Sequence, residues 1–161
     1  VTPHRDEIYF VTSTPEPDFQ VESWSAMGDL EILRDAYKNF HPQVRSVLAA
    51  CPNVHKWALF ERDPVPQWRK GRVPLLGDSC HPMTPYMAQG AAAAIEDAAV
   101  IARCLTGVGH NGIKAALQKY ENHRKPRTSR IQKISRLNDL GKIKIETARV
   151  FSYDAWREIL S

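Results

Sequence analysis

In the first half of the chain, short apolar runs alternate with proline-rich breaks. Residues 7–13 (EIYFVTS) and 55–63 (HKWALFERD) are rich in β-branched and aromatic side chains, which predicts a strand in each. Residues 71–78 (GRVPLLGD) predict a third, shorter strand that is apolar enough to be buried on both faces.

Two helices are predicted between the first two strands. Asp29 is a favourable N-cap for a helix that runs to about Phe40, because apolar residues follow it at helical spacing. Pro42 suits the first turn of a second helix, which ends near Cys51.

The second half of the chain is predicted to be helical from Met87 onward. The first helix places its apolar residues on one face: Ala88, Ala91, Ala92, Ile95, Ala98, Ala99, Ala102 and Leu105. Residues 106–112 (TGVGHNG) break this helix, and Pro126 is expected to interrupt or kink the next one. The helical pattern resumes to about residue 151, and Trp156 is placed in a final short helix.

This order of elements is that of a mixed α/β (α+β) chain with too few strands for a complete sheet. We therefore expect the chain to be the C-terminal part of a longer protein.

Composition and charge exclude several classes of protein. The chain has 161 residues, of which 43% are hydrophobic, and a net charge of +4, which is too weak to indicate nucleic-acid binding. Its apolar runs are too short for a membrane helix. Three cysteines without paired spacing favour a reducing cytoplasm over a disulfide scaffold, and metal-ligand spacing is lacking.

The stretch LLGDSCHPMTPYMAQGAAAAIEDAA (75–99) carries the most chemistry. Asp78 follows an apolar run, and Gly90 opens a helix whose first residues, Ala91 and Ala92, leave the backbone bare. A helix N-terminus favours negative charge and carbonyl oxygens, and a carboxylate binds hydroxyls. This pattern fits a cradle for a polyhydroxylated, partly anionic cofactor. From the residues alone, close packing of the alanines and a turn capped by Asp78 explain it equally well.

The same stretch resembles the C-terminal flavin-binding motif of single-component, FAD-dependent aromatic hydroxylases of the para-hydroxybenzoate hydroxylase superfamily. The matching positions are Gly71, Arg72, Leu75, Gly77, Asp78, His81, Pro82, Pro85 and Gly90. Ser79 and Cys80 replace the more common Ala-Ala of the family. The resemblance covers at least residues 55–150.

The resemblance implies a cofactor site. Asp78 would bind ribityl hydroxyls of FAD, and Pro85 would lie close to the reactive edge of the flavin ring. The backbone N–H groups of Ala91 and Ala92 would meet the flavin N1 and C2 carbonyl, where negative charge develops on reduction. The full set of cofactor-binding residues implied is Arg72, Gly77, Asp78, Pro85, Gln89, Gly90, Ala91 and Ala92.

The resemblance also implies an activity, in which NADH or NADPH reduces the flavin and O2 hydroxylates an aromatic or N-heteroaromatic acid. Salicylate and 6-hydroxynicotinate are the leading expected substrates. The candidates for catalytic residues are His4, Tyr9, His81 and Tyr86. Three of them have a plain alternative role: His81 as a brace for its loop, Tyr9 as a core residue and His4 as a solvated side chain.

Half of the family's site has no counterpart here, because the sequence contains no Gly-x-Gly-x-x-Gly after a strand. We therefore expect residues 1–66 to be part of a substrate-binding domain and residues 67–161 the C-terminal part of an FAD-binding domain. Alone, the chain is expected to bind FAD weakly and to be inactive without the missing N-terminal half. No nucleic acid or membrane partner is expected, and a homodimer is left open.

Two other functions remain to be tested. GDS after an apolar run also resembles the motif of Gly-Asp-Ser-Leu esterases, with Ser79 as nucleophile, although a later Asp-x-x-His is missing. Residues 124–149 carry nine basic residues against two acidic ones, which is a pattern of non-enzymatic interaction helices. An apolar stripe (Ile131, Ile134, Leu137, Leu140 and Ile145) favours an ordinary amphipathic helix instead.

Overall fold

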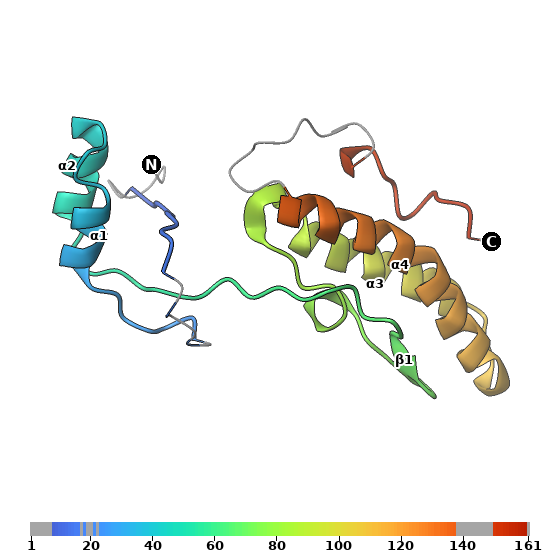
Figure 1. The fold of residues 1–161 in the computed structure, drawn as a ribbon. Coiled ribbons are helices and arrows are strands. Elements are labelled where there is room, and N and C mark those ends of the chain that lie inside the picture. Colours follow the sequence, from blue (N-terminus) through green and yellow to red (C-terminus); the bar gives the residue numbers. More distant parts are fainter. Residues whose placement is uncertain (1–7, 17, 19–20, 22, 138–149, 161) are drawn as a thin grey trace. The chain divides into compact units, whose positions relative to one another are not determined.

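A computed structural model describes residues 8–16, 18, 21, 23–137 and 150–160 of the chain. The chain divides into two units, Val1–Leu59 and Phe60–Ser161 (Figure 1). None of the described helices combines the length and the apolar character that crossing a bilayer requires.

The first unit contains the two predicted helices, α1 (Leu30–Ala36) and α2 (Pro42–Ala50). The prediction that Asp29 caps α1 is confirmed, because its carboxylate accepts hydrogen bonds from the N–H groups of Glu31 and Ile32. α1 ends at Ala36 rather than near Phe40. Arg34 joins the two helices by donating to backbone carbonyls at the end of α2 and just beyond it.

Two of the three predicted strands are wrong for the described residues. Residues 8–13 and 56–63 form no strand, and the only pairing of this region is an isolated bridge between Met27 and His55. A strand exists only where a neighbouring backbone accepts from its N–H groups and donates to its C=O groups, and among the described residues these two segments have no such continuous neighbour: the N–H of Lys56 bonds to the carbonyl of Ala26, but no ladder follows.

The third predicted strand is present but very short. β1 (Arg69–Lys70) and β2 (Val73–Pro74) form an antiparallel hairpin that turns at Gly71, whose φ of 65° suits glycine. Val73 is 69% exposed, so the expected burial on both faces is wrong.

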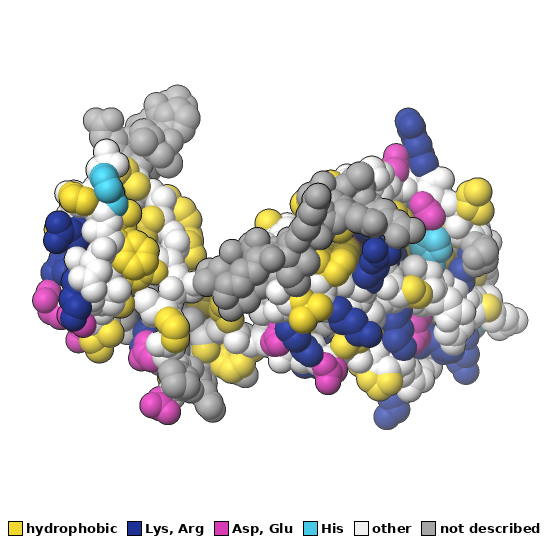
Figure 2. Space-filling view, turned by 45° about the horizontal axis from the view of Figure 1, so that its top comes forward, with side chains coloured by type: hydrophobic (Ala, Val, Ile, Leu, Met, Phe, Trp, Pro, Cys, Tyr) yellow, Lys and Arg dark blue, Asp and Glu magenta, His cyan; other side chains and the backbone are white. Residues whose placement is uncertain are grey.

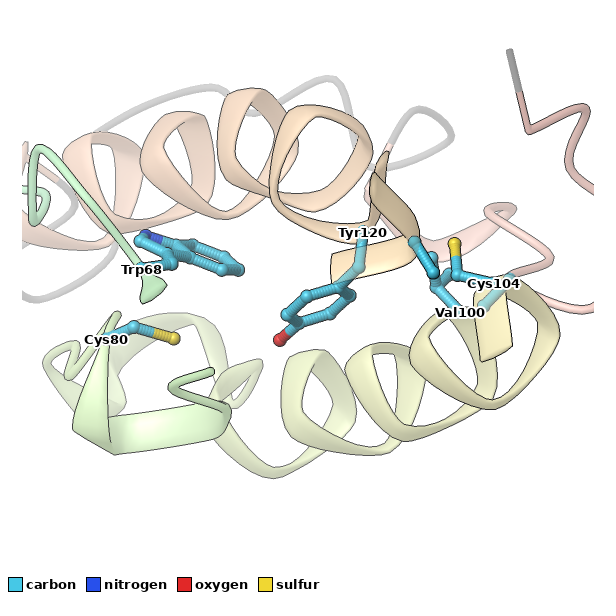
Figure 3. Packing of buried hydrophobic residues seen from close by; sticks show 7 residues of the cluster. Trp68, Cys80, Val100, Cys104 and Tyr120 are labelled. Atoms are coloured by element: carbon cyan, nitrogen blue, oxygen red, sulfur yellow. The ribbon is translucent and has the colours of Figure 1, made fainter. Parts of the chain in front are cut away.

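The second unit is built on two long helices, α3 (Gly90–Leu105) and α4 (Ile113–Leu137), which lie side by side (Figure 1). Three 3₁₀ helices complete it: η1 (Gly77–Ser79), η2 (Pro85–Met87) and η3 (His110–Gly112). Trp68 and Tyr120 fill the space between the helices together with Cys80, Val100 and Cys104 (Figure 3).

The buried face of α3 is not the alanine stripe that its spacing predicted. The buried residues are Ala93, Asp97, Val100 and Cys104, whereas Ala91, Ala98 and Ala102 are exposed and Ile95 is 72% exposed. Small apolar residues surround much of this helix, so periodicity alone did not identify the face. The buried face includes the acid Asp97, and its burial is possible because Arg124 of α4 pairs with it.

Pro126 does not interrupt its helix: α4 continues through it to Leu137. Proline removes the hydrogen bond to the carbonyl four residues earlier, which belongs to Asn122. Both residues are exposed, so water can bind that carbonyl.

The end of the chain differs from the expected final helix. Residues 138–149, which include Leu140 and Ile145, lie outside the described residues, and Trp156 lies in a turn. Asp154 stabilises that turn by accepting from the N–H groups of Trp156 and Arg157. Arg103 of α3 holds the segment in place through the carbonyls of Ala155 and Glu158.

Candidate functional site

The turn η1 is where the predicted motif begins, and Gly77 shapes it. Gly77 is buried with φ of 61°, and a Cβ at this position would lie 3.1 Å from the Cβ of Ala94 in α3. Its carbonyl accepts from the N–H groups of Cys80 and His81, each at 3.0 Å. The turn therefore packs tightly against α3 and presents the next residue, Asp78, to solvent.

We expect Gly77→Ala to lower the free energy of unfolding by about 2–5 kcal/mol, since a left-handed alanine costs about 1–2 kcal/mol and overpacking about 1–3 kcal/mol. Gly107→Ala is the matched control, because Gly107 has φ of 71° but no neighbouring atom within 4 Å of its Cβ position. Urea unfolding followed by circular dichroism measures both. An equal loss in the two variants would show that the contact with Ala94 contributes nothing.

Asp78 lies beside the start of α3, as the cradle hypothesis requires. Its Oδ1 is 3.9 Å from the position that a Cβ on Gly90 would occupy. The N-cap residue Gln89 makes no side-chain capping bond, so the first N–H groups of α3 have no side-chain acceptor from it. Ala91 is exposed and Ala92 is half-buried in this first turn. The carboxylate of Asp78 and the first turn of α3 are therefore neighbours, with the side chain of Met83 also beside Gly90.

A shallow pocket of ≈ 300 Å³ opens on one side of Asp78. Its lining consists of Phe60, Glu61, Arg62, Asp78, Ser79 and Pro82. Arg62 donates to the carbonyl of Ser79 and so ties the entering chain to the turn η1.

Beneath the turn lies a buried ionic network that the sequence analysis missed. Asp97 of α3 accepts hydrogen bonds from the N–H of Gly77 (3.1 Å), from Nε2 of His81 (2.5 Å) and from Nε of Arg124 (2.7 Å). Arg124 also donates to Glu96 (2.7 Å) and to the carbonyl of Ala93 (3.2 Å). An acid out of phase with the alanine stripe was the one signal in the sequence that pointed to it.

The network keeps Asp97 ionised. Burial by itself raises the pKa of a carboxyl group, but hydrogen bonds from His81 and Arg124 outweigh it and hold the pKa of Asp97 below its ordinary value of 3.8. A depressed folded-state pKa stabilises the fold above the unfolded-state pKa, and this stabilisation is lost as the pH falls through the folded-state value.

We therefore expect the urea midpoint of the chain to fall as the pH is lowered from about 4, near the unfolded-state pKa of an aspartate. Because other carboxylates titrate in this range, the informative quantity is the difference between the wild-type chain and Asp97→Asn. This difference should shrink below pH 4. A difference that stays constant between pH 7 and pH 2 would contradict the depressed pKa of Asp97.

His81 is fully buried, and its ring lies 5.4 Å from that of Trp68. Its Nε2–H donates a hydrogen bond to Asp97, while Nδ1 has no hydrogen-bond partner among the described residues. With Cys80 and Asp97 it forms a cluster of metal-ligating types. Burial raises the pKa of the Cys80 thiol to about 12, and Asp97 is already bound by Arg124, so a hydrogen-bond network explains this cluster better than a metal site.

The loop from His81 to Pro85 is held by α4. Gln132 donates to the carbonyl of Pro82 (3.0 Å), and the hydroxyl of Ser135 donates to the carbonyl of Thr84 (2.6 Å). These contacts position η2, where Pro85 is exposed and Tyr86 is half-buried.

The remaining predicted site residues lie elsewhere. Arg72 is at the hairpin, where its Nη1 lies 2.6 Å from Nε2 of His110. Tyr9 belongs to the first unit and is 83% exposed. His4 lies outside the described residues.

The geometry does not favour the esterase alternative. The hydroxyl of Ser79 donates to the carbonyl of Leu76 (2.7 Å) and accepts from its N–H (3.0 Å). The neighbouring histidine, His81, is engaged by Asp97 instead. A serine nucleophile needs a histidine within hydrogen-bond reach, and none bonds to Ser79 in the described part of the chain.

The interaction-helix alternative is also disfavoured. Arg124 and Arg127 pair with Glu96, and Arg136 pairs with Glu61 and Asp63. On the face shown in Figure 2, basic side chains are interspersed with acidic and hydrophobic ones. Lys142, Lys144 and Arg149 lie outside the described residues.

Comparison with known proteins supports the flavin interpretation of this site. The chain is 45% identical over 161 residues to a 6-hydroxynicotinate 3-monooxygenase of Bordetella bronchiseptica, which covers 99% of this chain and 42% of that protein. It is 42% identical over 156 residues to the protein of that name from Pseudomonas fluorescens, covering 97% and 40%. The chain thus spans about two fifths of the curated relatives that it matches.

Solved structures agree with the relatives. A salicylate hydroxylase substrate complex superimposes with a TM-score of 0.70 at 26% identity, covering 90% of this chain and 39% of that one. The structure of CtdE in complex with FAD gives a TM-score of 0.69 at 27% identity, covering 88% and 37%. A family model described as FAD binding domain matches residues 4–135. The resemblance is confirmed, and the chain belongs to this family of FAD-binding domains.

Proposed function

We propose that the protein to which this chain belongs hydroxylates an aromatic or N-heteroaromatic acid, using FAD, NADH or NADPH, and O2. The observation that carries the proposal is the position of Asp78 beside the uncapped start of α3. The names of the relatives favour 6-hydroxynicotinate as substrate, and the likeness to salicylate hydroxylase makes salicylate the second candidate.

The residues at the site fit a flavin. The carboxylate of Asp78 accepts hydrogen bonds from hydroxyls, such as those of the ribityl chain. The absence of a Cβ at Gly90 leaves the backbone N–H groups of Ala91 and Ala92 accessible to a flat ring. Their partial positive charge stabilises the negative charge that develops on a reduced flavin. When bound, FAD supplies hydride acceptance from the nicotinamide and the activation of O2.

The other residues have supporting roles in this proposal. Pro85, exposed in η2, would lie against the flavin ring, and Tyr86, Tyr9 and His4 are the candidates for orienting the substrate and moving its phenolic proton. His81, fully buried and bonded to Asp97, acts as a brace rather than as an acid or base for the substrate. Gln89 is the N-cap residue of α3 without a side-chain capping bond, and contacts of Gln89 and Arg72 with the cofactor stay predictions.

We assign residues 1–66 to a substrate-binding domain and residues 67–161 to the FAD-binding domain. The structural division falls earlier than this boundary, because the unit that holds Asp78 begins at Phe60, and Phe60, Glu61 and Arg62 line the pocket beside Asp78.

A chimera tests the proposal. This chain replaces the matching segment of the Bordetella bronchiseptica relative, and the purified chimera is assayed for bound FAD and for O2 uptake with 6-hydroxynicotinate and with salicylate. We expect bound FAD and substrate-dependent O2 uptake with product formation. A folded chimera that retains FAD but hydroxylates neither acid would contradict the proposed substrates, and one that retains no FAD would contradict the flavin site.

The variant Asp78→Ala in the chimera tests the role of its carboxylate. Losing a hydrogen bond from a ribityl hydroxyl to a charged acceptor is expected to weaken FAD binding by about 1.5–3 kcal/mol, or roughly ten- to a hundredfold. Asp63→Ala is the control, because Asp63 is an exposed acid that pairs with Arg136 and does not line the pocket.

A further inference from the structure

We propose that Asp97 is a positioning residue of this site, whose single carboxylate fixes Asp78 relative to the N-terminus of α3. The proposal rests on the proposed function for its purpose, and on the buried contacts of Asp97 for its mechanism.

Asp97 holds the turn η1 through hydrogen bonds from two residues. One oxygen, Oδ2, accepts from the N–H of Gly77 and from Nε2 of His81. These two residues lie on either side of the segment 78–80. The carboxylate therefore accepts a hydrogen bond from each end of the turn that presents Asp78.

Asp97 is itself part of α3. It lies seven residues after Gly90, which is about two helical turns or 10 Å along a rigid helix. The turn and the helix start are consequently joined through one side chain and move as one body. A ribityl chain held by Asp78 and a ring held at the helix start need this fixed separation, because binding groups that are already in place cost less free energy to engage.

Arg124 of α4 binds the other oxygen of the same carboxylate. The side chain of Arg124 is fully buried, and its Nε donates to Oδ1 of Asp97 at 2.7 Å. This charge keeps the carboxylate ionised, so both oxygens remain acceptors. Since Asp97 is itself fully buried, it acts through Gly77 and His81 and touches no ligand.

The adjacent acid provides a matched control. Glu96 also pairs with Arg124, and with Arg127 as well, but among the described residues it makes no hydrogen bond to the turn η1. Glu96→Gln therefore weakens the same arginine network without loosening Asp78. In contrast, Asp97→Asn puts an amide N–H against a donor in either orientation, towards the turn or towards Arg124.

The test is amide hydrogen exchange, measured by NMR on the whole 161-residue chain. In Asp97→Asn we expect exchange of the Gly77 and His81 amides to rise about tenfold or more relative to those of α4, as loss of a charge-assisted hydrogen bond predicts. In Glu96→Gln the same ratio should stay within about threefold of the wild type. Equal changes in the two variants, or none in Asp97→Asn, overturn the proposal.

If Asp97→Asn does not fold, His81→Leu gives the second measurement, because leucine has no donor for Asp97 and the pair of Asp97 with Arg124 is kept. The amides of Cys80 and of residue 81 should then exchange faster, while that of Gly77 stays protected. Unchanged exchange at Cys80 and at residue 81 overturns the proposal.

Flavin binding separates this proposal from the proposed function. In the chimera, Asp97→Asn should release FAD at least tenfold more readily than Glu96→Gln. Equal retention reduces Asp97 to a structural residue and overturns the proposal. A wild-type chimera without FAD counts against the proposed function alone, because the exchange measurement still decides whether Asp97 fixes the turn.

Discussion

Replacing Arg124 by alanine is expected to lower the free energy of unfolding by about 3–5 kcal/mol, which is the cost of breaking a buried ion pair from one side. Arg124 is fully buried between Asp97 and Glu96. Without it, the charge of Asp97 is left in the interior with only Gly77 and His81 as donors, because water cannot reach it.

Urea unfolding of the variants at pH 7, followed by circular dichroism, measures this loss. Arg136→Ala is the matched control: Arg136 lies on the same helix and pairs with Glu61 and Asp63, but at the surface. Exposed pairs contribute little, so its midpoint should stay close to that of the wild type. Losses of similar size in the two variants would contradict the central place of Arg124 in the core.

The second large effect is expected for Trp68→Ala, with a loss of about 3–5 kcal/mol, as is usual when a large buried aromatic side chain is removed. Trp68 is 1% exposed, and its ring lies 5.4 Å from that of His81 and 5.8 Å from that of Tyr120. Figure 3 shows it in the space between the helices, so its removal leaves a cavity within the buried cluster.

Trp156→Ala is the control for this variant, because Trp156 is 66% exposed and its loss should change the free energy of unfolding by less than about 0.5 kcal/mol. Trp68→Phe adds a further comparison. It removes the indole N–H, which is buried without a partner among the described residues, and should cost less than the alanine variant. The expected difference between a buried and an exposed tryptophan is contradicted if Trp68→Ala and Trp156→Ala unfold at the same urea concentration.

Asp78 and Gly90 were singled out from the sequence because their chemistry is local: an acid after an apolar run and a helix start without large side chains. Gly77 came from the family motif, and the role of all three in binding FAD stays a prediction. Asp97 and Arg124 were missed, because they are 27 residues apart in the sequence and meet only when α3 and α4 pack. The one local signal is that Asp97 lies out of phase with the alanine stripe, and it does not identify Arg124 as the partner.

The sequence by itself determined the elements whose stability is local. Asp29 caps α1, Pro42 opens α2, and residues 106–112 separate α3 from α4, each through backbone preferences and hydrogen bonds that span only a few residues. The tertiary structure decided the rest. Residues 8–13 and 56–63 are not strands in this chain, because a strand depends on a partner far away in the sequence. The buried face of α3 likewise depends on its ion pair with Arg124 rather than on the spacing of the alanines. A buried carboxylate such as Asp97 is stable only where another element supplies its counter-charge.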